Sequence, residues 1–330
     1  LREHYRCHPK IINFCNQRFY GGRLLIMTED RGEPDVITAW RTVLGHHARG
    51  AFNPREIETI RREVLPSLPC EQAEIGIISP YNEQVNALHR ELGEGIDVAT
   101  VHKFQGREKE AIILSTVDDQ ITAFTDDPNL LNVAVSRAKR QFTLVTSSNE
   151  QPDSRDIADL LAYIDYNGGK ITESTIHSVF DMLYEPYAEA RREFLKRHRR
   201  ISEFDSENLI YALLEQVLEA EPAFRYLGVL CHQPLRQLIR DWTLLNDEER
   251  RYASNGATHL DFLIYNRVSK RPVLAIETDG YQFHKQGTRQ SERDRMKDRI
   301  LDRYALPLLR LSTTGTDEEA KIKDQLSKIV

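Results

Sequence analysis

Acidic residues in the second half of the chain are placed where they could hold a metal ion. Asp261 lies in the apolar run 258–266, and Glu277 lies near the end of the next apolar run, 272–278. If these runs form neighbouring strands, the two acids come together, and carboxylate oxygens are the ligands that Mg²⁺ or Mn²⁺ prefers. Such a cation lowers the pKa of a bound water and stabilises the leaving oxygen in phosphodiester cleavage. The pattern predicts a metal site with Asp261 and Glu277 as ligands.

A charged helix expected from about residue 289 to 304 carries two further candidates. Arg293 and Lys297 are four residues apart and therefore share one side of the helix. That side could contact the DNA backbone or the scissile phosphate. A surface ladder of ion pairs with Asp294 and Asp298 is the alternative interpretation of the same charges.

Two arginines in the first half of the chain suit a different reaction. Transfer of a phosphoryl group needs fixed positive charge against the charge that spreads over the phosphoryl oxygens. Arg6, within HYRCHP, and Arg137, within AVSRAK, are the candidates for supplying it.

Alternating strands and helices must position these arginines. Apolar, β-branched runs at 75–79, 98–101, 111–117 and 142–147 alternate with helical patterns at 53–65 and 81–92. Continuous apolar runs are typical of buried parallel strands, and the alternation indicates a mostly parallel sheet with helices on its faces. We expect this α/β domain to span residues 1–150.

The rest of the chain is expected to form a linker and a smaller domain. Residues 151–200 are helical and polar and end in the basic stretch 191–200, which indicates a helical linker or a small helical unit. A solvated helix face and a nucleic-acid contact are both open for that stretch. From residue 201 the pattern is a helix, a pair of strands, a helix, a strand and a last helix. This is a compact α/β domain over residues 201–330.

Composition narrows the class of protein. The 330 residues suggest two domains, and 40% hydrophobic with 29% charged residues is typical of a soluble globular protein. No apolar run approaches the ~20 residues that span a bilayer, so we expect no membrane contact. The four cysteines form no CxxC pair, which argues against a zinc knuckle or a disulfide framework and fits a reducing cytoplasm. A net charge of -6 requires any nucleic-acid contact to be a local groove.

Four segments of the first half resemble, in this order and spacing, the conserved segments of the second RecA-like domain of superfamily 1 helicases, most closely the nonsense-decay-factor type. They are LREHYRCHPKIINFCNQRFYGG (1–22), IGIISPYNEQVNALHREL (75–92), VATVHKFQGREKEAIILSTV (98–117) and NLLNVAVSRAKRQFTLVTSS (129–148). The resemblance covers about the first 150 residues.

The resemblance implies roles for residues at a bound nucleotide. Arg137 would be the arginine finger, and Arg6 would lie at the nucleotide. Tyr5 would pack on the base, and Glu108 would hold the sugar. A solvated helix arginine is the alternative for Arg137, and a plain packing tyrosine is the alternative for Tyr5.

A second set of residues would face single-stranded nucleic acid. These residues follow strands, at the edge where open α/β sheets place ligand contacts. By resemblance, hydroxyl and backbone N–H groups there would meet phosphate. The set comprises Ser79, Pro80, Tyr81, Thr100, His102 and Gln105.

A phosphate-cradling loop of the form GxxxxGK[ST] does not occur in the sequence. Gly168-Gly169-Lys170 has Ile171 where the hydroxyl is needed. The chain is therefore expected to be a C-terminal fragment without ATPase activity of its own. It would use ATP only together with the missing N-terminal RecA-like domain of the same protein.

Residues 201–330 resemble the PD-(D/E)XK nuclease superfamily, especially its very-short-patch-repair-like branch and related domains fused to bacterial helicases. The resemblance implies a small α/β, restriction-endonuclease-like fold with Asp261 and Glu277 as the metal carboxylates. Glu207 matches an acid that many members add from the first helix. Interaction with the helix dipole is the alternative for Glu207.

The chain departs from this nuclease pattern at one position. The lysine expected two residues after the second acid is Asp279 here. Lys285 or His284 could replace it as general base, or Asp279 could add a third carboxylate. A local hydrogen-bonding role is the alternative for His284.

Together these features predict the C-terminal part of an ATP-dependent DNA helicase or translocase with a nuclease domain that uses Mg²⁺ or Mn²⁺. RNA is not excluded as the nucleic acid. The alternative is a nuclease fold that has lost catalysis and only binds nucleic acid, which the replacement of lysine by Asp279 favours. A regulatory remnant of a motor is a third hypothesis, and the presence of Arg6, Glu108 and Arg137 opposes it.

Overall fold

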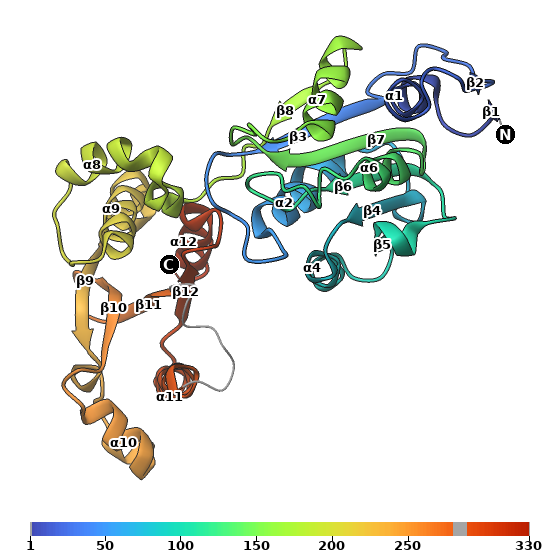
Figure 1. Ribbon diagram of the computed structural model, residues 1–330. Coiled ribbons are helices and arrows are strands. Elements are labelled where there is room, and N and C mark those ends of the chain that lie inside the picture. The colour runs from blue at the N-terminus through green and yellow to red at the C-terminus, as the bar shows by residue number, and fades with distance from the viewer. Residues whose placement is uncertain (1, 280–288, 330) are drawn as a thin grey trace. The chain divides into compact units, whose positions relative to one another are not determined.

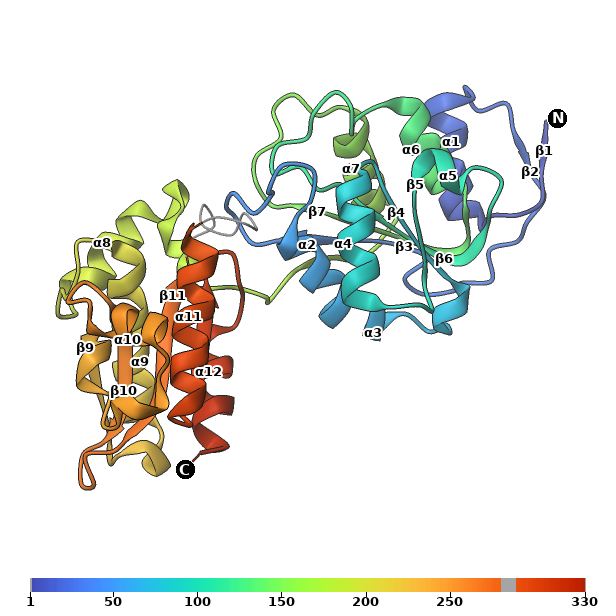
Figure 2. The same cartoon turned by 90° about the horizontal axis from the view of Figure 1, so that it is seen from below.

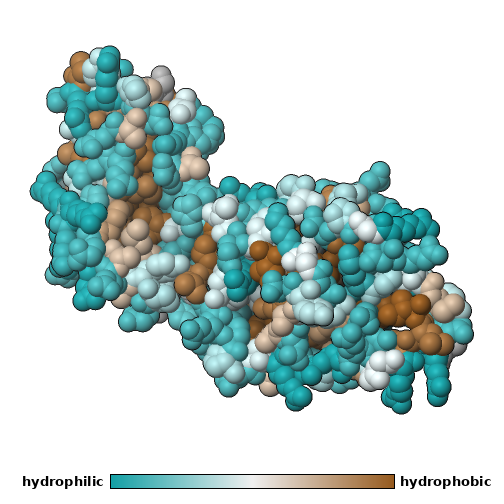
Figure 3. All heavy atoms as spheres, turned by 90° about the horizontal axis from the view of Figure 1, so that it is seen from above, coloured by the Kyte–Doolittle hydropathy of each residue, from teal (hydrophilic) through white to brown (hydrophobic). Residues whose placement is uncertain are grey.

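The computed structural model describes residues 2–279 and 289–329, without the side chains of 289–291. Its two compact units are Leu1–His177 and Ser178–Val330 (Figure 1). Within the described residues, no helix is both long enough and apolar enough to cross a membrane. On the face drawn in Figure 3, hydrophilic residues cover most of the surface and hydrophobic residues appear in separate patches.

A six-stranded sheet forms the centre of the first unit, in the order β5-β4-β6-β7-β3-β8. All of its strand pairs are parallel, which confirms the predicted parallel α/β class. The strands β4, β5, β6 and β7 coincide with the four apolar runs, whereas β3 and β8 were not expected. The strands are β3 (Ile37–Thr42), β4 (Ile75–Ser79), β5 (Asp97–Thr100), β6 (Lys109–Ser115), β7 (Ala138–Ser147) and β8 (Ile171–Glu173).

Helices cover both faces of this sheet, so consecutive strand residues such as Ile77 and Ile78 are buried in opposite cores. Figure 1 shows α1 and α7 on one side and α2 and α4 on the other; the latter two are in front in Figure 2. A short parallel pair, β1 (Glu3–His4) and β2 (Leu25–Ile26), lies beside the sheet. The helices are α1 (Pro9–Phe19), α2 (Pro54–Thr59), α3 (Leu65–Ser67), α4 (Asn82–Leu92), α5 (Val101–Phe104), α6 (Pro128–Val135) and α7 (Asp156–Tyr166), with a π-helical turn (Ile60–Val64) between α2 and α3.

The expected linker over 151–200 is not a separate body, because its two parts pack on different units. Leu160 and Ile164 of α7 are buried in the first core, and β8 pairs with β3 at the sheet edge. Phe180, by contrast, is buried in the core of the second unit. The boundary therefore falls at His177 and Ser178.

A four-stranded mixed sheet forms the second unit, in the order β12-β11-β10-β9. β9, β10 and β11 are antiparallel neighbours, and β12 runs parallel to β11. β9 was not expected; it is a half-exposed edge strand and lacks a continuous apolar run. The strands are β9 (Leu227–Pro234), β10 (His259–Asn266), β11 (Pro272–Asp279) and β12 (Leu308–Ser312).

The two faces of this sheet are covered by different helices. Phe262 and Ile276 pack with residues of α9 and α12, whereas Leu263 and Ala275 pack with residues of α11. Because strand side chains alternate, Asp261 and Glu277 share the face of Leu263 and Ala275. The helices are α8 (Ala188–Lys196), α9 (Asp205–Ala220), α10 (Asp247–Ser254), α11 (Arg289–Arg303) and α12 (Glu318–Ser327).

Candidate functional site

A charged cluster lies at the sheet edge where β6 and β7 begin. Arg6, just after β1, forms an ion pair with Glu108, just before β6. Arg137, just before β7, donates from Nε to the Val133 carbonyl (3.3 Å) and from a terminal nitrogen to Ser136 Oγ (3.1 Å). These bonds fix its guanidinium at the end of α6. In the described part of the chain, Arg137 has no acidic partner.

The charges of this cluster act on the same two neighbours, the buried Cys7 and the half-buried His4. Burial raises the pKa of Cys7 to about 11, and Arg6 and Arg137 offset part of that rise. Burial lowers the pKa of His4, and both arginines act in the same direction. The structure therefore brings together the three charged residues that the sequence assigns to a nucleotide.

Tyr5, the fourth residue assigned to the nucleotide, is accessible. Its side chain is 63% exposed, and its hydroxyl donates a hydrogen bond to Glu3. The ring is therefore free to stack on a planar group.

The residues assigned to a nucleic-acid strand lie at the opposite edge, where β4 and β5 end. Pro80 and Tyr81 are half-buried and His102 and Gln105 are exposed, whereas Ser79 and Thr100 are buried. The Ser79 hydroxyl was expected to meet phosphate, but it is fully buried because β4 lies between β5 and β6. Its Oγ accepts a hydrogen bond from the Tyr81 N–H (3.5 Å).

Asp118, which the sequence pattern did not indicate, organises this edge. It accepts hydrogen bonds from the hydroxyls of Tyr81 (3.0 Å), Thr122 (2.8 Å) and Thr125 (2.6 Å). The ring of Phe124, in the same loop, lies 5.4 Å from the Tyr81 ring and is about half exposed. A single polar residue in a loop carries no periodic signal, so the sequence could not have indicated this network.

Glu56 is a second buried acid that sequence reasoning missed. It lies on α2 and accepts hydrogen bonds from the Thr116 hydroxyl (3.1 Å) and the Val117 N–H (3.0 Å), and from Ser115. Complete burial raises the pKa of Glu56 to about 8, although these hydrogen bonds oppose the rise. The carboxyl group ties α2 to the end of β6.

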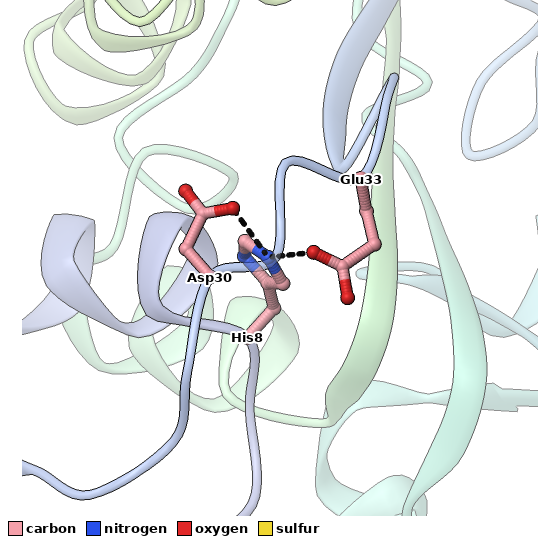
Figure 4. Close-up of side chains that lie close together, drawn as sticks. All are labelled: His8, Asp30 and Glu33. Carbon is pink, nitrogen blue, oxygen red and sulfur yellow. Dashed lines mark hydrogen bonds and ion pairs between the residues drawn. The ribbon is translucent and has the colours of Figure 1, made fainter.

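The side chains of His8, Asp30 and Glu33 lie close together at the N-terminal end of α1 (Figure 4). His8 Nε2 lies 3.5 Å from Asp30 Oδ1 and 3.3 Å from Glu33 Oε2. His8 Nδ1 accepts the Lys10 N–H and caps α1, so the neutral ring carries its proton on Nε2 and can donate it to the carboxylates. A metal ion on Nε2 would require a protonated Nδ1, which the cap opposes. We interpret the cluster as a helix cap.

An acidic pocket of about 580 Å³ lies in the second unit, lined by residues of α9, β10, β11 and α11. β10 and β11 pair with Phe262 opposite Ile276, so the next step of this register sets Asp261 opposite Glu277. Asp261 Oδ2 accepts the Thr278 N–H (2.8 Å), and Glu277 Oε1 accepts the Asp261 N–H (3.3 Å). The two acids are adjacent, as the sequence predicts.

Lys297 occupies a different position from the one expected. It was predicted on a nucleic-acid-facing side of its helix, but it is 8% exposed and donates from Nζ to Glu277 Oε2 (2.6 Å) and to the His259 carbonyl (2.9 Å). Lys297 lies on the side of α11 that packs on the sheet. The charged pattern of α11 did not reveal this side. Arg293 is exposed and lines the pocket.

Burial and a nearby negative charge raise the pKa values of both acids. Burial raises the pKa of Glu277 to about 7, with Asp261 adding to the rise and Lys297 opposing it. Burial also raises the pKa of Asp261, to which Glu207 contributes. When two neighbouring acids resist losing both of their protons, a bound cation stabilises the doubly ionised form of the pair.

Glu207 and Asp279 line the same pocket as Asp261 and Glu277, but each is paired with another residue. Glu207 Oε2 lies 2.8 Å from His232 Nε2, and Asp279 Oδ1 lies 3.4 Å from Arg310. Among the described residues, His8, Asp30 and Glu33 are the group whose three ligand atoms all lie within 4.8 Å of one another. The carboxylates of Glu207, Asp261 and Glu277 do not form such a close set among the described residues, and Glu207 and Glu277 are paired with His232 and Lys297. Direct ligation by Glu207 stays a prediction. Lys285 and His284 lie outside the described residues.

Comparisons with known proteins support the assignment of the first unit. Residues 1–149 match a family model described as an AAA domain, and residues 204–329 match one described as a protein of unknown function (DUF2726). The uncharacterized ATP-dependent helicase C05C10.2 of Caenorhabditis elegans is 32% identical over 167 residues. The 5'-3' DNA helicase ZGRF1 of Mus musculus and a regulator of nonsense transcripts 1 homolog of Drosophila melanogaster are each 31% identical.

These alignments cover only part of each protein. Each spans 44% of this chain and 11%, 9% and 15% of the respective relative. The matches support a superfamily 1 helicase, RecA-like part in the first unit. The family matched by the second unit assigns it no activity.

Proposed function

We propose that this chain combines the second motor domain of an ATP-dependent DNA helicase with a nuclease domain that cleaves DNA with a divalent cation. The motor role is supported by the helicase relatives and by the cluster of Arg6, Glu108 and Arg137. In this proposal Arg137 acts as an arginine finger on ATP held between this domain and a first motor domain. The exposed Tyr5 stacks on the base.

The nuclease role rests on one observation, the triad of Asp261, Glu277 and Lys297 in the acidic pocket, in which Glu277 and Lys297 are buried and Asp261 is half-buried. The two acids lie opposite each other on β10 and β11, and the ammonium group is 2.6 Å from Glu277. Burying charged groups costs free energy of folding. Charged residues with shifted pKa values that line a pocket are therefore candidates for catalytic or metal-binding residues.

The donor set in the pocket fits a divalent cation with oxygen ligands. Asp261 Oδ1 has no hydrogen-bond donor within the described residues, and the hydroxyl of Thr278, on the same pocket, is buried without a partner there. Mg²⁺ is commonly bound through one or two carboxylates and several waters. Asp261 and Glu277 would hold the ion directly, and Glu207 would hold one of its waters. The ion would supply an activated water and stabilise the leaving oxygen.

In the nuclease pattern a lysine is expected at the position that Asp279 occupies on β11. In this proposal Lys297 supplies that ammonium group instead. It reaches Glu277 from α11 and not from the strand. An ammonium group has three donors, and two are used by Glu277 and the His259 carbonyl. The third remains for a phosphate oxygen or the attacking water. Arg293, exposed on the same pocket, would bind the DNA backbone.

A DNA-binding domain without catalysis is the second candidate function. The observation in its favour is the ion pair between Lys297 and Glu277. Because Lys297 neutralises Glu277, the negative charge left to bind a cation comes mainly from Asp261. In that case the pocket would be a structural ion-pair network, and DNA would be bound without being cut.

Cleavage assays with purified protein and Mn²⁺ separate the two candidates. We expect single-stranded, duplex or forked DNA to be cut, and Asp261→Asn and Lys297→Met each to lower the rate by at least about 100-fold. The asparagine keeps an oxygen for the Thr278 N–H, so the fold should be retained. Asp247→Asn, at a 91% exposed acid of α10, is the matched control and should cut normally. Binding without cutting of any substrate would reject the nuclease role.

A further inference from the structure

A basic segment, residues 191–200, comprises most of α8, from Arg191 to Lys196, and the four residues that follow it. Its cations are Arg191, Arg192, Lys196, Arg197, Arg199 and Arg200, against one acid, Glu193. All of these cations except Arg191 are exposed. Within the described part of the chain, Arg192, Arg197 and Arg199 have no ion pair, so their charge is available to a ligand.

Specific contacts fix this segment to the second unit. Arg191 donates to the Met182 carbonyl (2.8 Å) and forms an ion pair with Asp205, the first residue of α9 (3.2 Å). The ring of His198 lies 4.4 Å from the ring of Phe194 and closes the end of α8. These contacts hold the backbone that carries the exposed cations.

The segment lies close to the Glu207 side of the acidic pocket. Arg191 contacts the first turn of α9, which also carries Glu207. Burial raises the pKa of Cys231 to about 11, and Arg199 offsets part of that rise. Cys231 pairs with Phe262 on the α9 and α12 side of the sheet, and the next residue, His232, bonds to Glu207 (2.8 Å). The positive segment and the acidic pocket therefore both adjoin the first turn of α9.

The acidic residues of the pocket favour additional positive charge nearby for a polyanionic substrate, beyond that of Arg293 and Lys297. Asp261, Glu277, Asp279 and Asp294 all line the pocket, and their field repels phosphate. Nucleic-acid affinity comes mainly from Lys and Arg that neutralise backbone phosphates. On a chain with a net charge of -6, such residues must be concentrated locally.

We propose that residues 191–200 form a phosphate-binding surface that holds the DNA backbone beside the acidic pocket. This inference rests on the proposed function of the pocket. The surface binds through charge, without reading sequence, and the bound strand passes the first turn of α9. Arg197 and Arg199 are its central contacts, since both are exposed and unpaired in the described chain.

Matched double variants of the whole chain test this surface. Arg197→Ala/Arg199→Ala removes two charges at the segment. Arg267→Ala/Arg271→Ala removes two exposed charges at the β10–β11 turn, the opposite end of these strands from Asp261 and Glu277. Affinity for a fluorescent oligonucleotide is measured with EDTA at several salt concentrations, so that cleavage does not enter the readout.

We expect the first variant to bind about tenfold more weakly near 0.1 M salt. The slope of log K against log salt should be reduced by about 0.7–0.9 for each phosphate that is no longer neutralised. The control should match the wild type. Unchanged binding in both variants, or equally weakened binding in both, would overturn the proposal. The two proposals can fail independently. If only Arg197→Ala/Arg199→Ala weakens DNA binding, but the wild-type protein never cuts DNA, the phosphate-binding surface is supported and the nuclease role is rejected.

Discussion

At the scale of single residues, the sequence could predict the acids but not their partners. Asp261 and Glu277 were identified because alternation along strands makes the position of each side chain readable from its own segment. Lys297 depends on how α11 docks on the sheet, which no local pattern encodes, and the structure buries it against Glu277. Asp118 and Glu56 are contacts between distant segments and were missed for the same reason.

Glu56 gives a pH-dependent prediction for the first unit. Its pKa in the folded chain is about 8 against an ordinary value of 4.5, so the folded state binds the proton more tightly. The contribution of Glu56 to stability is therefore full below pH 4.5 and is lost as pH rises towards 8, at up to about 1.4 kcal/mol per pH unit. Urea midpoints measured between pH 5.5 and 7.5 should fall less steeply in Glu56→Gln than in wild type. Identical slopes would contradict this assignment.

At the scale of elements, prediction succeeded where a strand appears as a continuous apolar, β-branched run; β3 is an interior strand but its sequence, ITAWRT, is no such run and was not recognised. β4, β5, β6 and β7 are buried parallel strands and appear as apolar runs. β8 is short and β9 is half-exposed, and neither carries a continuous apolar run, whereas the edge strand β5 does and was expected. Within the predicted linker, the polar helical pattern concealed the buried face of α7 and the buried Phe180.

The close packing of β4 gives a prediction at this scale. A Cβ at Gly76 would lie 2.5 Å from a Phe104 ring atom and 2.7 Å from Ile112 Cδ1. Gly76→Ala should therefore cost about 1–3 kcal/mol, which corresponds to a fall in melting temperature of about 2–4 °C per kcal/mol. Gly256→Ala meets no atom within 4 Å and serves as the control. Thermal unfolding that is equal in both variants would show that β4 can relax.

At the scale of the whole molecule, the proposed function joins a motor part to a nuclease part. The sequence contains no phosphate-cradling GxxxxGK[ST] loop, so the chain alone should show no ATPase activity above background. Adding a first motor domain should produce ATP turnover, and Arg137→Ala should then lower it by about 10³-fold or more. Arg140→Ala, at an exposed arginine three residues away, is the control. Turnover by the chain alone that depends on Arg137 would contradict the assignment of this half-site.

The central claim, that Asp261 and Glu277 bind a catalytic divalent cation, is tested most directly by anomalous diffraction from crystals soaked in Mn²⁺. We predict a peak within about 2.0–2.6 Å of one oxygen of Asp261 and one of Glu277, and no such peak in Asp261→Asn crystals. Lys297 should remain within hydrogen-bonding distance of Glu277 or move to a ligand of the ion. Well-ordered wild-type crystals with no peak between these carboxylates would contradict the claim and leave the pocket as an ion-pair network.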